Sequence, residues 1–425
     1  MLVQIEALSY LCLRYVQQSL SPFEILIGPN ASGKSTFLDV VAFLADMVRE
    51  KEGVAAAVAA RAPDVRDLCW MQGSDAFELA VEAAIPQPAP GTNHRLGNFT
   101  RVRYEVRVGI HAESNKTSLL GETLWLRSEA DTTEQRSGEP RTLFPMPAHP
   151  PDSMLRAAGS HSPPGWRRVL NKVAESGNDY FRSETSDWNN LFRLGPQRSA
   201  LANLPEDEDR FPVSIWFRRL LLEGVQRLAL NSAAMRRPSP AGSSHRFSPD
   251  GSNLPWVVHD LSERDPQRLQ DWIAHVRTAL PDLQNIRTVE RPEDRHRYLV
   301  LEYSTGLQAP SWAVSDGTLR LLALTVLAYI PDLAGIYLIE EPENGLHPRA
   351  VETVFQSLSS VYSAQVLLAT HSPIILSLAD PEQVLCFART DEGATDIVRG
   401  SEHPSLRGWR KEIDLGTLFA SGVLG

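Results

Sequence analysis

The sequence predicts an α/β fold with a mainly parallel core sheet flanked by helices, an antiparallel β subdomain and a helical lobe. Three observations support this prediction. Residues 23–49 read as an apolar strand, a glycine-rich turn and an amphipathic helix. In the last 115 residues, helices separate strands that do not alternate between apolar and polar residues. Such strands are typical of a parallel sheet covered on both faces. Apolar and polar residues alternate strictly over residues 100–108, as in an antiparallel strand.

The predicted core combines residues 1–50 with residues 310–425, two segments far apart in the chain. The first contributes a strand at residues 23–27 and a helix at residues 36–49, whose apolar residues recur at three- and four-residue spacing. The second alternates between helices and strands, so the first segment must complete its sheet. Its expected elements are a helix at 319–329, a strand at 335–339, a helix at 350–360, a strand at 365–369, a short helix after Pro373 and a strand at 383–388.

The remaining residues, 51 to about 310, are inserted between the two segments of this core. Residues 51–130 are expected to be β-rich, with a helix or surface hairpin at 54–60. Residues 131–310 are expected to hold an insertion with long loops and a helical lobe. Helices are expected at 212–230 and from Asp265, a side-chain cap that is followed by Pro266 in the first turn. Proline-rich loops are expected at 128–165 and 236–244.

The composition excludes several classes of protein. The 425 residues carry 42 Lys and Arg against 52 Asp and Glu, a net charge of −10, so the overall field repels nucleic acid and any DNA contact must be local. The three cysteines are far apart and odd in number, which predicts no disulfide framework or paired-cysteine zinc site and favours a reducing cytoplasm. The longest apolar run, residues 321–330, is too short to cross a membrane, so we expect no membrane contact.

The strongest chemical signal is the turn after the first core strand. Residues 28–35 read Gly-Pro-Asn-Ala-Ser-Gly-Lys-Ser and match the phosphate-binding pattern GxxxxGK[ST] between a strand and a helix. Backbone amides and the helix start favour a phosphate, Lys34 would reach the β and γ phosphates, and Ser35 would bind Mg²⁺. The alternative is a turn in which the glycines have only a structural role, but this would explain neither Lys34 nor Ser35. The expected nucleotide-binding residues are Gly28, Pro29, Asn30, Ala31, Ser32, Gly33, Lys34, Ser35 and Thr36.

Two later strands end in groups that could act on a bound triphosphate. The strand at 335–339 is followed by Glu340 and Glu341, where open α/β sheets bind ligands. Glu340 would hold the metal and Glu341 would act as general base toward the attacking water. The next strand ends at His371, 30 residues after Glu341, so both could lie at neighbouring strand ends and His371 could sense the γ-phosphate. Solvated acids and a capping or packed histidine are the alternatives.

A fourth motif, Ser315-Asp316-Gly317-Thr318, begins a helix, and a helix cap is a sufficient explanation by itself. The order of all four motifs, however, resembles the ATP-binding-cassette superfamily. The resemblance is to its branch of RecF-like, SMC-like and OLD-like ATPases, often described as AAA-type, and it covers roughly residues 1–50 and 310–390. It implies that residues 315–317 form a signature motif that closes over ATP bound to a second subunit.

By this resemblance, Lys34, Glu341 and His371 are the catalytic residues, and Ser315, Asp316 and Gly317 complete the nucleotide site. The metal ligands would be Ser35, Glu340 and a bridging glutamine, for which we favour Gln197, with Gln72 as the alternative. Two departures stand out. Glu340 occupies a position where aspartate is commoner, and Asp316 places a negative charge where many cassettes have a small residue.

The resemblance implies a cytoplasmic homodimer that holds two ATP molecules and Mg²⁺, closes on binding ATP and reopens on hydrolysis. No nuclease signature follows His371, so an effector such as a nuclease would be a separate protein, and DNA is a possible partner. Anti-phage defence and DNA repair are the roles this implies. The alternative is an ATP-stabilised scaffold with little turnover that assembles a nuclease or toxin complex. Arg101, Arg103 and Arg107 share one strand face, which is either solvated or binds DNA or a partner.

Overall fold

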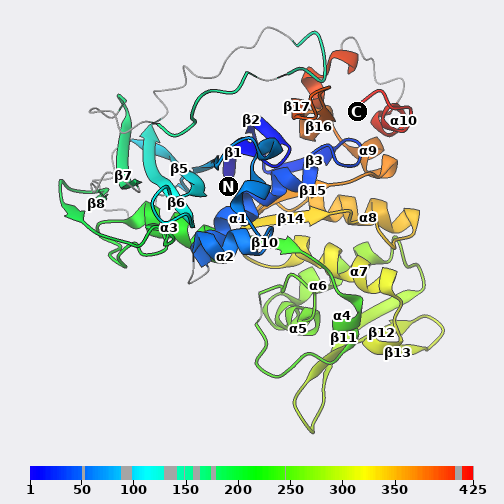
Figure 1. Ribbon diagram of the computed structural model, residues 1–425. Coiled ribbons are helices and arrows are strands. Elements are labelled where there is room, and N and C mark those ends of the chain that lie inside the picture. Colours follow the sequence, from blue (N-terminus) through cyan, green and yellow to red (C-terminus); the bar gives the residue numbers. More distant parts are fainter. Residues whose placement is uncertain are drawn as a thin grey trace.

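The fold was analysed in a computed structural model, which describes residues 1–49, 53–87, 98–128, 141–147, 149–156, 163–173, 179–244, 246–406 and 414–424. Three sheets and the helices around them make up the described chain (Figure 1). The expected loop at 128–165 lies partly outside these residues; residue 128 ends a strand, and residues 141–147, 149–156 and 163–165 contain no helix or strand. No helix in the described ranges combines the length and apolar character needed to cross a bilayer.

The core sheet is mainly parallel, as predicted. Its strand order is β10-β14-β15-β3-β16-β17, and only the edge pair β16–β17 is antiparallel. Strand β3 from the N-terminal segment lies between β15 and β16, so residues near the two ends of the chain complete one sheet. The strands are β3 (Phe23–Ile27), β10 (Val225–Leu228), β14 (Ile336–Glu340), β15 (Gln365–Ala369), β16 (Val384–Arg389) and β17 (Thr395–Arg399).

Both faces of the core sheet are covered. Leu26 packs into a cluster with α1 (Lys34–Arg49), whereas its neighbours Ile25 and Ile27 pack on the opposite face against the helices that follow β14. The other helices are α2 (Val54–Ala59), α3 (Pro212–Arg219), α4 (Ser232–Arg236), α5 (Leu254–Arg264), α6 (Pro266–Val276), α7 (Asp316–Thr325), α8 (Pro348–Ser359), α9 (Pro373–Leu378) and α10 (Leu415–Ala420).

One predicted helix, at residues 212–230, is wrong in its last third. The chain is helical from Pro212, but it becomes the edge strand β10 at Val225. The reason lies at Gly224 and Gly335, just before the paired strands β10 and β14. A Cβ on Gly335 would lie 2.3 Å from the carbonyl oxygen of Gly224, so the two backbones approach too closely for any side chain. Val225 and Leu228 also fit helical spacing, which is why periodicity alone does not identify this strand.

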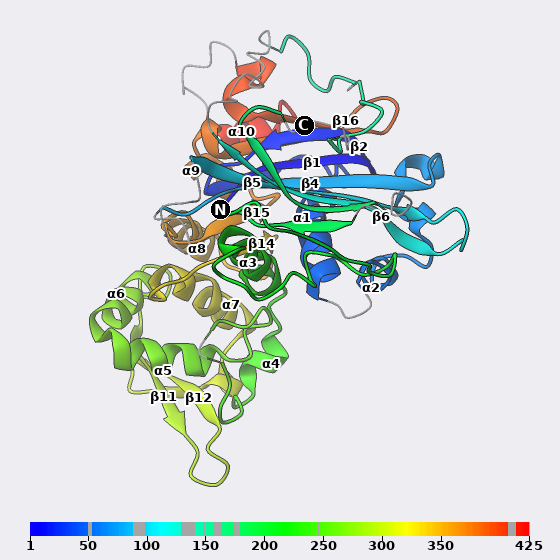
Figure 2. The same ribbon diagram turned by 90° about the vertical axis from the view of Figure 1, so that its left-hand side faces the viewer.

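An eight-stranded antiparallel sheet packs on α1 from the side opposite the core sheet (Figure 2). Its order is β2-β1-β4-β5-β6-β7-β8-β9, so β1 and β2 belong to it rather than to the parallel core that we expected for residues 1–50. The strands are β1 (Leu2–Tyr10), β2 (Leu13–Ser19), β4 (Ala76–Ala84), β5 (Phe99–Ile110), β6 (Thr117–Ser128), β7 (Trp166–Val173), β8 (Tyr180–Arg182) and β9 (Asn189–Leu191).

The arginine face of β5 is neither solvated nor free to bind DNA at its centre. Arg103 is buried, and its guanidinium contacts Glu6 at 2.6 Å, Glu105 at 2.5 Å and Glu82 at 3.3 Å. Backbone amides of residues 154–156 also donate to carboxylates of this face, including that of Glu105. The face is therefore a covered ion network.

Replacing Arg103 by alanine is expected to lower the free energy of unfolding by about 3–5 kcal/mol, because several buried carboxylates lose their cation. Chemical denaturation would measure this. Arg101→Ala is the control, since its side chain is 36% exposed and its contact to Glu82 is 3.7 Å; its expected effect is below about 1 kcal/mol. Equal losses in the two variants would contradict the ion-network interpretation.

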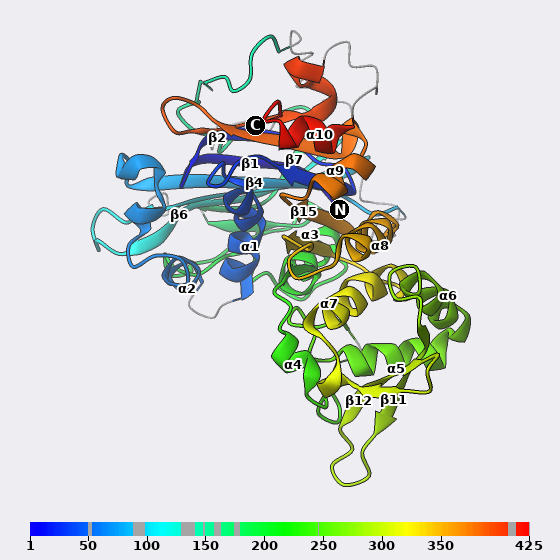
Figure 3. The ribbon, with the colours of Figure 1, turned by 90° about the vertical axis from the view of Figure 1, so that its right-hand side faces the viewer.

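The helical lobe contains α4 to α7 and a three-stranded sheet of β11 (Leu283–Glu290), β12 (Arg297–Tyr303) and β13 (Gln308–Pro310). The predicted start of α6 is confirmed, because the Asp265 side chain accepts a hydrogen bond from the backbone N–H of Arg268 at 3.1 Å. Helix α7 packs against α8 and joins the lobe to the core (Figure 3).

Candidate functional site

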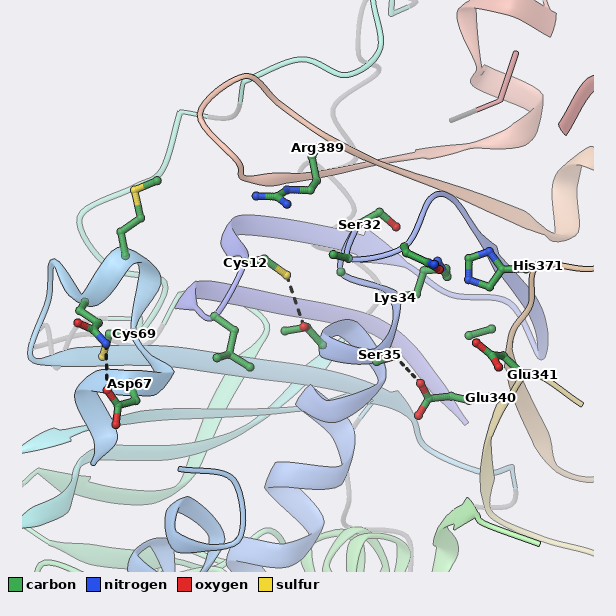
Figure 4. Close-up of a pocket in the computed structure, with 18 residues that line it drawn as sticks. Cys12, Ser32, Lys34, Ser35, Asp67, Cys69, Glu340, Glu341, His371 and Arg389 are labelled. Carbon is green, nitrogen blue, oxygen red and sulfur yellow. Dashed lines mark hydrogen bonds between the residues drawn. The ribbon is translucent and has the colours of Figure 1, made fainter. Parts of the chain in front are cut away.

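The candidate site lies at the carboxyl ends of four neighbouring strands of the core sheet. Strand β3 leads into residues 28–35, β14 ends at Glu340 and Glu341, β15 leads to His371, and β16 ends at Arg389 (Figure 4). Because β3, β14, β15 and β16 are parallel, these ends meet at one edge of the sheet.

The loop between β3 and α1 requires glycine at two positions. Gly28 has φ +146°, and a Cβ there would lie 2.2 Å from the carbonyl oxygen of Phe387. Gly33 has φ +103°, and its Cβ would lie 2.3 Å from the hydroxyl of Thr395. The loop is thus pressed against β16 and β17, and its inner surface is formed by backbone.

Lys34, the first residue of α1, points along the inside of this loop. Its side chain is buried, and its ammonium donates to the carbonyl oxygens of Gly28 at 2.8 Å and Pro29 at 2.9 Å. Burial lowers the pKa of Lys34 to about 8, although the carboxylates of Glu341 and Glu340 oppose the shift. A cation that is poorly solvated and held only by carbonyls is suited to pair with a phosphate.

Ser35 and Glu340 meet at the position expected for a metal. The Ser35 hydroxyl donates to Glu340 Oε2, and Nη2 of Arg227 on β10 donates to Glu340 Oε1 at 2.6 Å. The longer glutamate side chain therefore reaches both the serine on α1 and an arginine on the adjacent strand. Figure 4 shows the Ser35–Glu340 contact at the base of the site.

Glu341 is held in a strained backbone conformation, with φ +47°. Its N–H donates to the carbonyl oxygen of Ala369 at 2.8 Å, which joins the ends of β14 and β15, and its carboxylate accepts from the Asn344 amide. Left-handed backbone in a non-glycine residue is costly and is concentrated at functional sites. Here it directs the carboxylate into the cavity (Figure 4).

His371 follows β15 and lies near Lys34 and Glu341 (Figure 4). Glu343 fixes its backbone, since one carboxylate oxygen accepts from the His371 N–H at 2.9 Å and from the Thr370 hydroxyl at 2.7 Å. Burial, and secondarily the charge of Lys34, lower the pKa of His371, while Glu341 and Glu343 act in the opposite direction. The imidazole is therefore neutral at pH 7 and can share one hydrogen bond with an anionic oxygen.

These side chains surround one cavity of about 860 Å³. Ten of the predicted residues line it, whereas Gly28 and Pro29 contribute indirectly through the carbonyls that hold Lys34. The lining residues are Leu11, Cys12, Asn30, Ala31, Ser32, Gly33, Lys34, Ser35, Thr36, Asp67, Cys69, Met71, Gln72, Glu340, Glu341, Ala369, His371 and Arg389.

The donors around the cavity fit Mg-ATP. The Ser32 hydroxyl is buried in the loop and has no hydrogen-bond partner among the described residues, so it is available to a phosphate. Ser35 and Glu340 offer Mg²⁺ the oxygen ligands that it prefers. Within the described ranges, no group of three or more His, Cys, Asp and Glu side chains could hold a metal by itself. A magnesium ion here would consequently depend on phosphate oxygens and water for its other ligands.

The predicted signature residues lie outside this cavity. The Ser315 hydroxyl caps α7 by accepting from the Thr318 N–H at 3.2 Å, and Asp316 pairs with Arg236. Ser315 and Asp316 are exposed to solvent. A Cβ on Gly317 would lie 2.6 Å from the Gly345 carbonyl oxygen, so this tip touches the loop that follows Glu341. One chain therefore has a cavity and, separately, an exposed tip.

The structure does not bring Gln197 to the cavity. Its side-chain amide donates to the Thr117 carbonyl oxygen at 3.1 Å, and its backbone carbonyl accepts from the Val54 N–H. Gln197 therefore supports the start of α2. The alternative, Gln72, does line the cavity. Met71 and Gln72 have φ of +50° and +53°, so consecutive left-handed residues form this part of the wall.

Several lining residues have no motif in the sequence. Leu11 and Cys12 come from the turn between β1 and β2, and Met71 is 70% exposed at the rim. Arg389 was missed although a signal existed: it ends β16, in the same way as Glu340 ends β14. The strand-end argument applied to Glu340 and His371 also applies to Arg389.

Comparisons with known proteins bear on the family and the fold. The profile of a family described as "AAA domain, putative AbiEii toxin, Type IV TA system" matches residues 24–377. No curated protein matches the chain significantly. Among solved structures, an Smc head bound to the C-winged helix domain of ScpA aligns with a TM-score of 0.50 at 13% identity, covering 93% of this chain and 96% of that one. An Smc head domain with an extended coiled coil, bound to the C-terminal domain of ScpA derived from Pyrococcus furiosus, gives a TM-score of 0.49 at 11% identity and covers 93% and 95%.

Proposed function

The chain belongs to the family described as "AAA domain, putative AbiEii toxin, Type IV TA system", with the fold of an SMC-head-like P-loop ATPase, and on this basis we propose that it binds and hydrolyses Mg-ATP as a dimeric switch. In this proposal ATP closes two copies, hydrolysis reopens them, and the cycle controls a partner effector or DNA in anti-phage defence or DNA repair. The observation that carries it is the convergence of Lys34, Ser35, Glu340, Glu341 and His371 on one cavity.

Each residue has a role that its surroundings support. Mg-ATP would supply the phosphoanhydride and the charge that polarises it. Lys34 would transfer its ammonium from the two loop carbonyls to the phosphates, while Ser35 and Glu340 would hold the metal. Glu341, fixed by Asn344 and by the end of β15, would take a proton from the attacking water. Neutral His371 would mark the γ-phosphate position and distinguish ATP from ADP.

The exposed tip at residues 315–317 supports a dimer. It lies outside the cavity of its own chain and begins a helix, where backbone N–H groups favour an anion. In a head-to-tail pair, the tip of each copy would close the cavity of the other. The family description refers to a Type IV TA system, which has a second component, and the similar Smc head is bound to a ScpA domain; both support a separate partner protein.

Mixing two inactive variants tests this arrangement. Lys34→Ala damages the cavity and Ser315→Arg damages the tip, so each variant alone has two defective composite sites. In a mixed dimer both defects fall in one site and the other is intact; an equal mixture should therefore recover about a quarter of the wild-type ATPase rate. Lys34→Ala mixed with Glu341→Gln is the matched control, because both changes lie in the cavity and no intact site can form. Recovery in neither mixture, with both variants folded, would refute the sandwich.

The bridging glutamine can be assigned by a matched pair of substitutions. Gln72→Ala is expected to reduce Mg-dependent turnover about tenfold or more, because Gln72 lines the same cavity as Ser35 and Glu340. Gln197→Ala removes only the hydrogen bond to Thr117 and should leave turnover within about twofold. Steady-state ATPase assays at several Mg²⁺ concentrations would distinguish the two. A larger loss in Gln197→Ala would restore the original assignment.

One contact favours a second candidate function, an ATP-stabilised scaffold with little turnover that assembles a nuclease or toxin complex. Arg227 places a guanidinium 2.6 Å from Glu340, where it competes with Mg²⁺ for the carboxylate. Under this alternative, wild-type turnover would be no faster than that of Lys34→Ala, although ATP would still raise the thermal stability of the protein.

A further inference from the structure

A second cavity, of about 510 Å³, lies in the helical lobe, away from the site described above. It is bounded by the end of α4, the turn after β11 and the 3₁₀ segment Ser311–Ala313. The residues that line it are Ala233, Arg236, Arg237, Pro238, Arg291 and Trp312. We call it the arginine–tryptophan pocket.

The charge of this pocket is unusual for the chain. The chain has a net charge of −10, yet three guanidinium groups and no carboxylate line the pocket. Arg237 is exposed and makes no side-chain hydrogen bond or ion pair with the described residues. Arg291 contacts Asp294, which is 36% exposed, and Arg236 contacts Asp316, which is 61% exposed. Such solvent-exposed pairs are weak and can be exchanged for a phosphate.

Trp312 adds an aromatic surface beside these cations. Its side chain is 52% exposed, and its ring packs on Tyr298 with centroids 4.9 Å apart, which fixes the orientation of the indole. A large aromatic ring left open to solvent next to arginines is the arrangement that binds unpaired bases and the adjoining phosphates.

We propose that the arginine–tryptophan pocket binds single-stranded nucleic acid, with one base stacked on Trp312 and successive phosphates on Arg237 and Arg291. A duplex is disfavoured, because its bases are already stacked on each other and their faces are not available to Trp312. A free mononucleotide is disfavoured because the arginines stand on two separate segments, which suits several phosphates in a row better than one. The site needs neither ATP nor a dimer and therefore goes beyond the proposed function.

Fluorescence anisotropy with a labelled single strand of about 12 nucleotides, as DNA and as RNA, tests this on the full chain without ATP at low salt. Trp312→Ala and Arg291→Glu are each expected to weaken binding by about tenfold or more, and Arg237→Glu should do the same. Trp312→Phe should retain most of the affinity, because it keeps an aromatic face. The matched control is Arg268→Glu, since Arg268 is a half-exposed arginine of the same lobe with its own aspartate three residues away, as for Arg291. Its expected effect is below about twofold.

The salt dependence gives a second readout. Removing one arginine–phosphate interaction should make the slope of log K against log salt shallower by about 0.7, so Arg237→Glu should change the slope whereas Trp312→Ala should not. Thermal unfolding and ATP binding of each variant show that it is folded. Equal affinity in all variants would overturn the proposal. Equally tight binding of a duplex, or displacement of the strand by stoichiometric AMP, would overturn it as well.

Discussion

ATP turnover is expected to fall by about 10²–10⁴-fold when Glu341 is replaced by glutamine, while ATP affinity changes by less than about threefold. Glutamine preserves the shape of the side chain and can still contact Asn344, but it cannot take a proton from water. The left-handed backbone at Glu341 is unaffected by this substitution. Steady-state turnover and equilibrium titration with ATP measure the two effects separately.

Glu341→Gln should also accumulate the closed state, because ATP binds but is not removed. Light scattering is therefore expected to show dimers of this variant with ATP and Mg²⁺ and monomers with ADP. Glu352→Gln makes the same chemical change on the exposed face of α8 and should behave like the wild type. Full turnover in Glu341→Gln would contradict the role of Glu341 as general base. Abolished turnover without ATP-dependent dimers would contradict the ATP-gated dimer.

ATP affinity is expected to fall by about 10²-fold or more when Lys34 is replaced by alanine, because the cavity loses its buried cation and the phosphates lose a charge-assisted hydrogen bond. Isothermal titration measures the loss. Lys116→Ala is the control, because Lys116 is exposed and does not line the cavity, so its replacement removes the same charge outside the site. Unchanged affinity in Lys34→Ala would contradict the site.

The pKa of Lys34 adds a readout that simple misfolding cannot imitate. Its pKa is about 8 in the folded, nucleotide-free protein, against 10.5 for an unperturbed lysine. Between these values the unfolded chain binds more protons, so the free energy of unfolding should rise as pH increases from about 8 to 10.5. ATP affinity should decrease as pH rises through about 8, with proton uptake on binding. In Lys34→Ala both pH dependences attributable to this group should be absent.

The motif residues that line the cavity could be predicted from the sequence because they follow strands that are recognisable locally. Residues 28–35, Glu340 and His371 each lie at or just after the end of a short, mainly apolar strand, and parallel strands bring their ends together. The motif of residues 28–35 is also recognisable without the rest of the fold, although the contacts of Gly28 and Gly33 with Phe387 and Thr395 appear only in the folded chain.

What the sequence could not predict depends on contacts between distant segments. Gln197 and Gln72 are both in irregular regions, and only the folded chain decides which of them reaches the cavity. Arg103 is buried among carboxylates from three strands, Glu6, Glu82 and Glu105, and the backbone N–H of Arg156, far along the chain, also bonds Glu105. The strand at Val225 is specified by the close approach of Gly224 and Gly335, which local periodicity does not contain.

The central position of β3 has a consequence for biosynthesis. Its neighbours β15 and β16 are made roughly 340–360 residues later, so at ordinary translation speeds the emerging β3 waits about 17–70 s for them. The antiparallel sheet and α1 belong to the half of the molecule that is synthesised earlier, and they can pack first. Until the ribosome releases β15 and β16, both edges of the apolar strand β3 stay unpaired. A nascent chain in this condition would depend on chaperones to avoid aggregation.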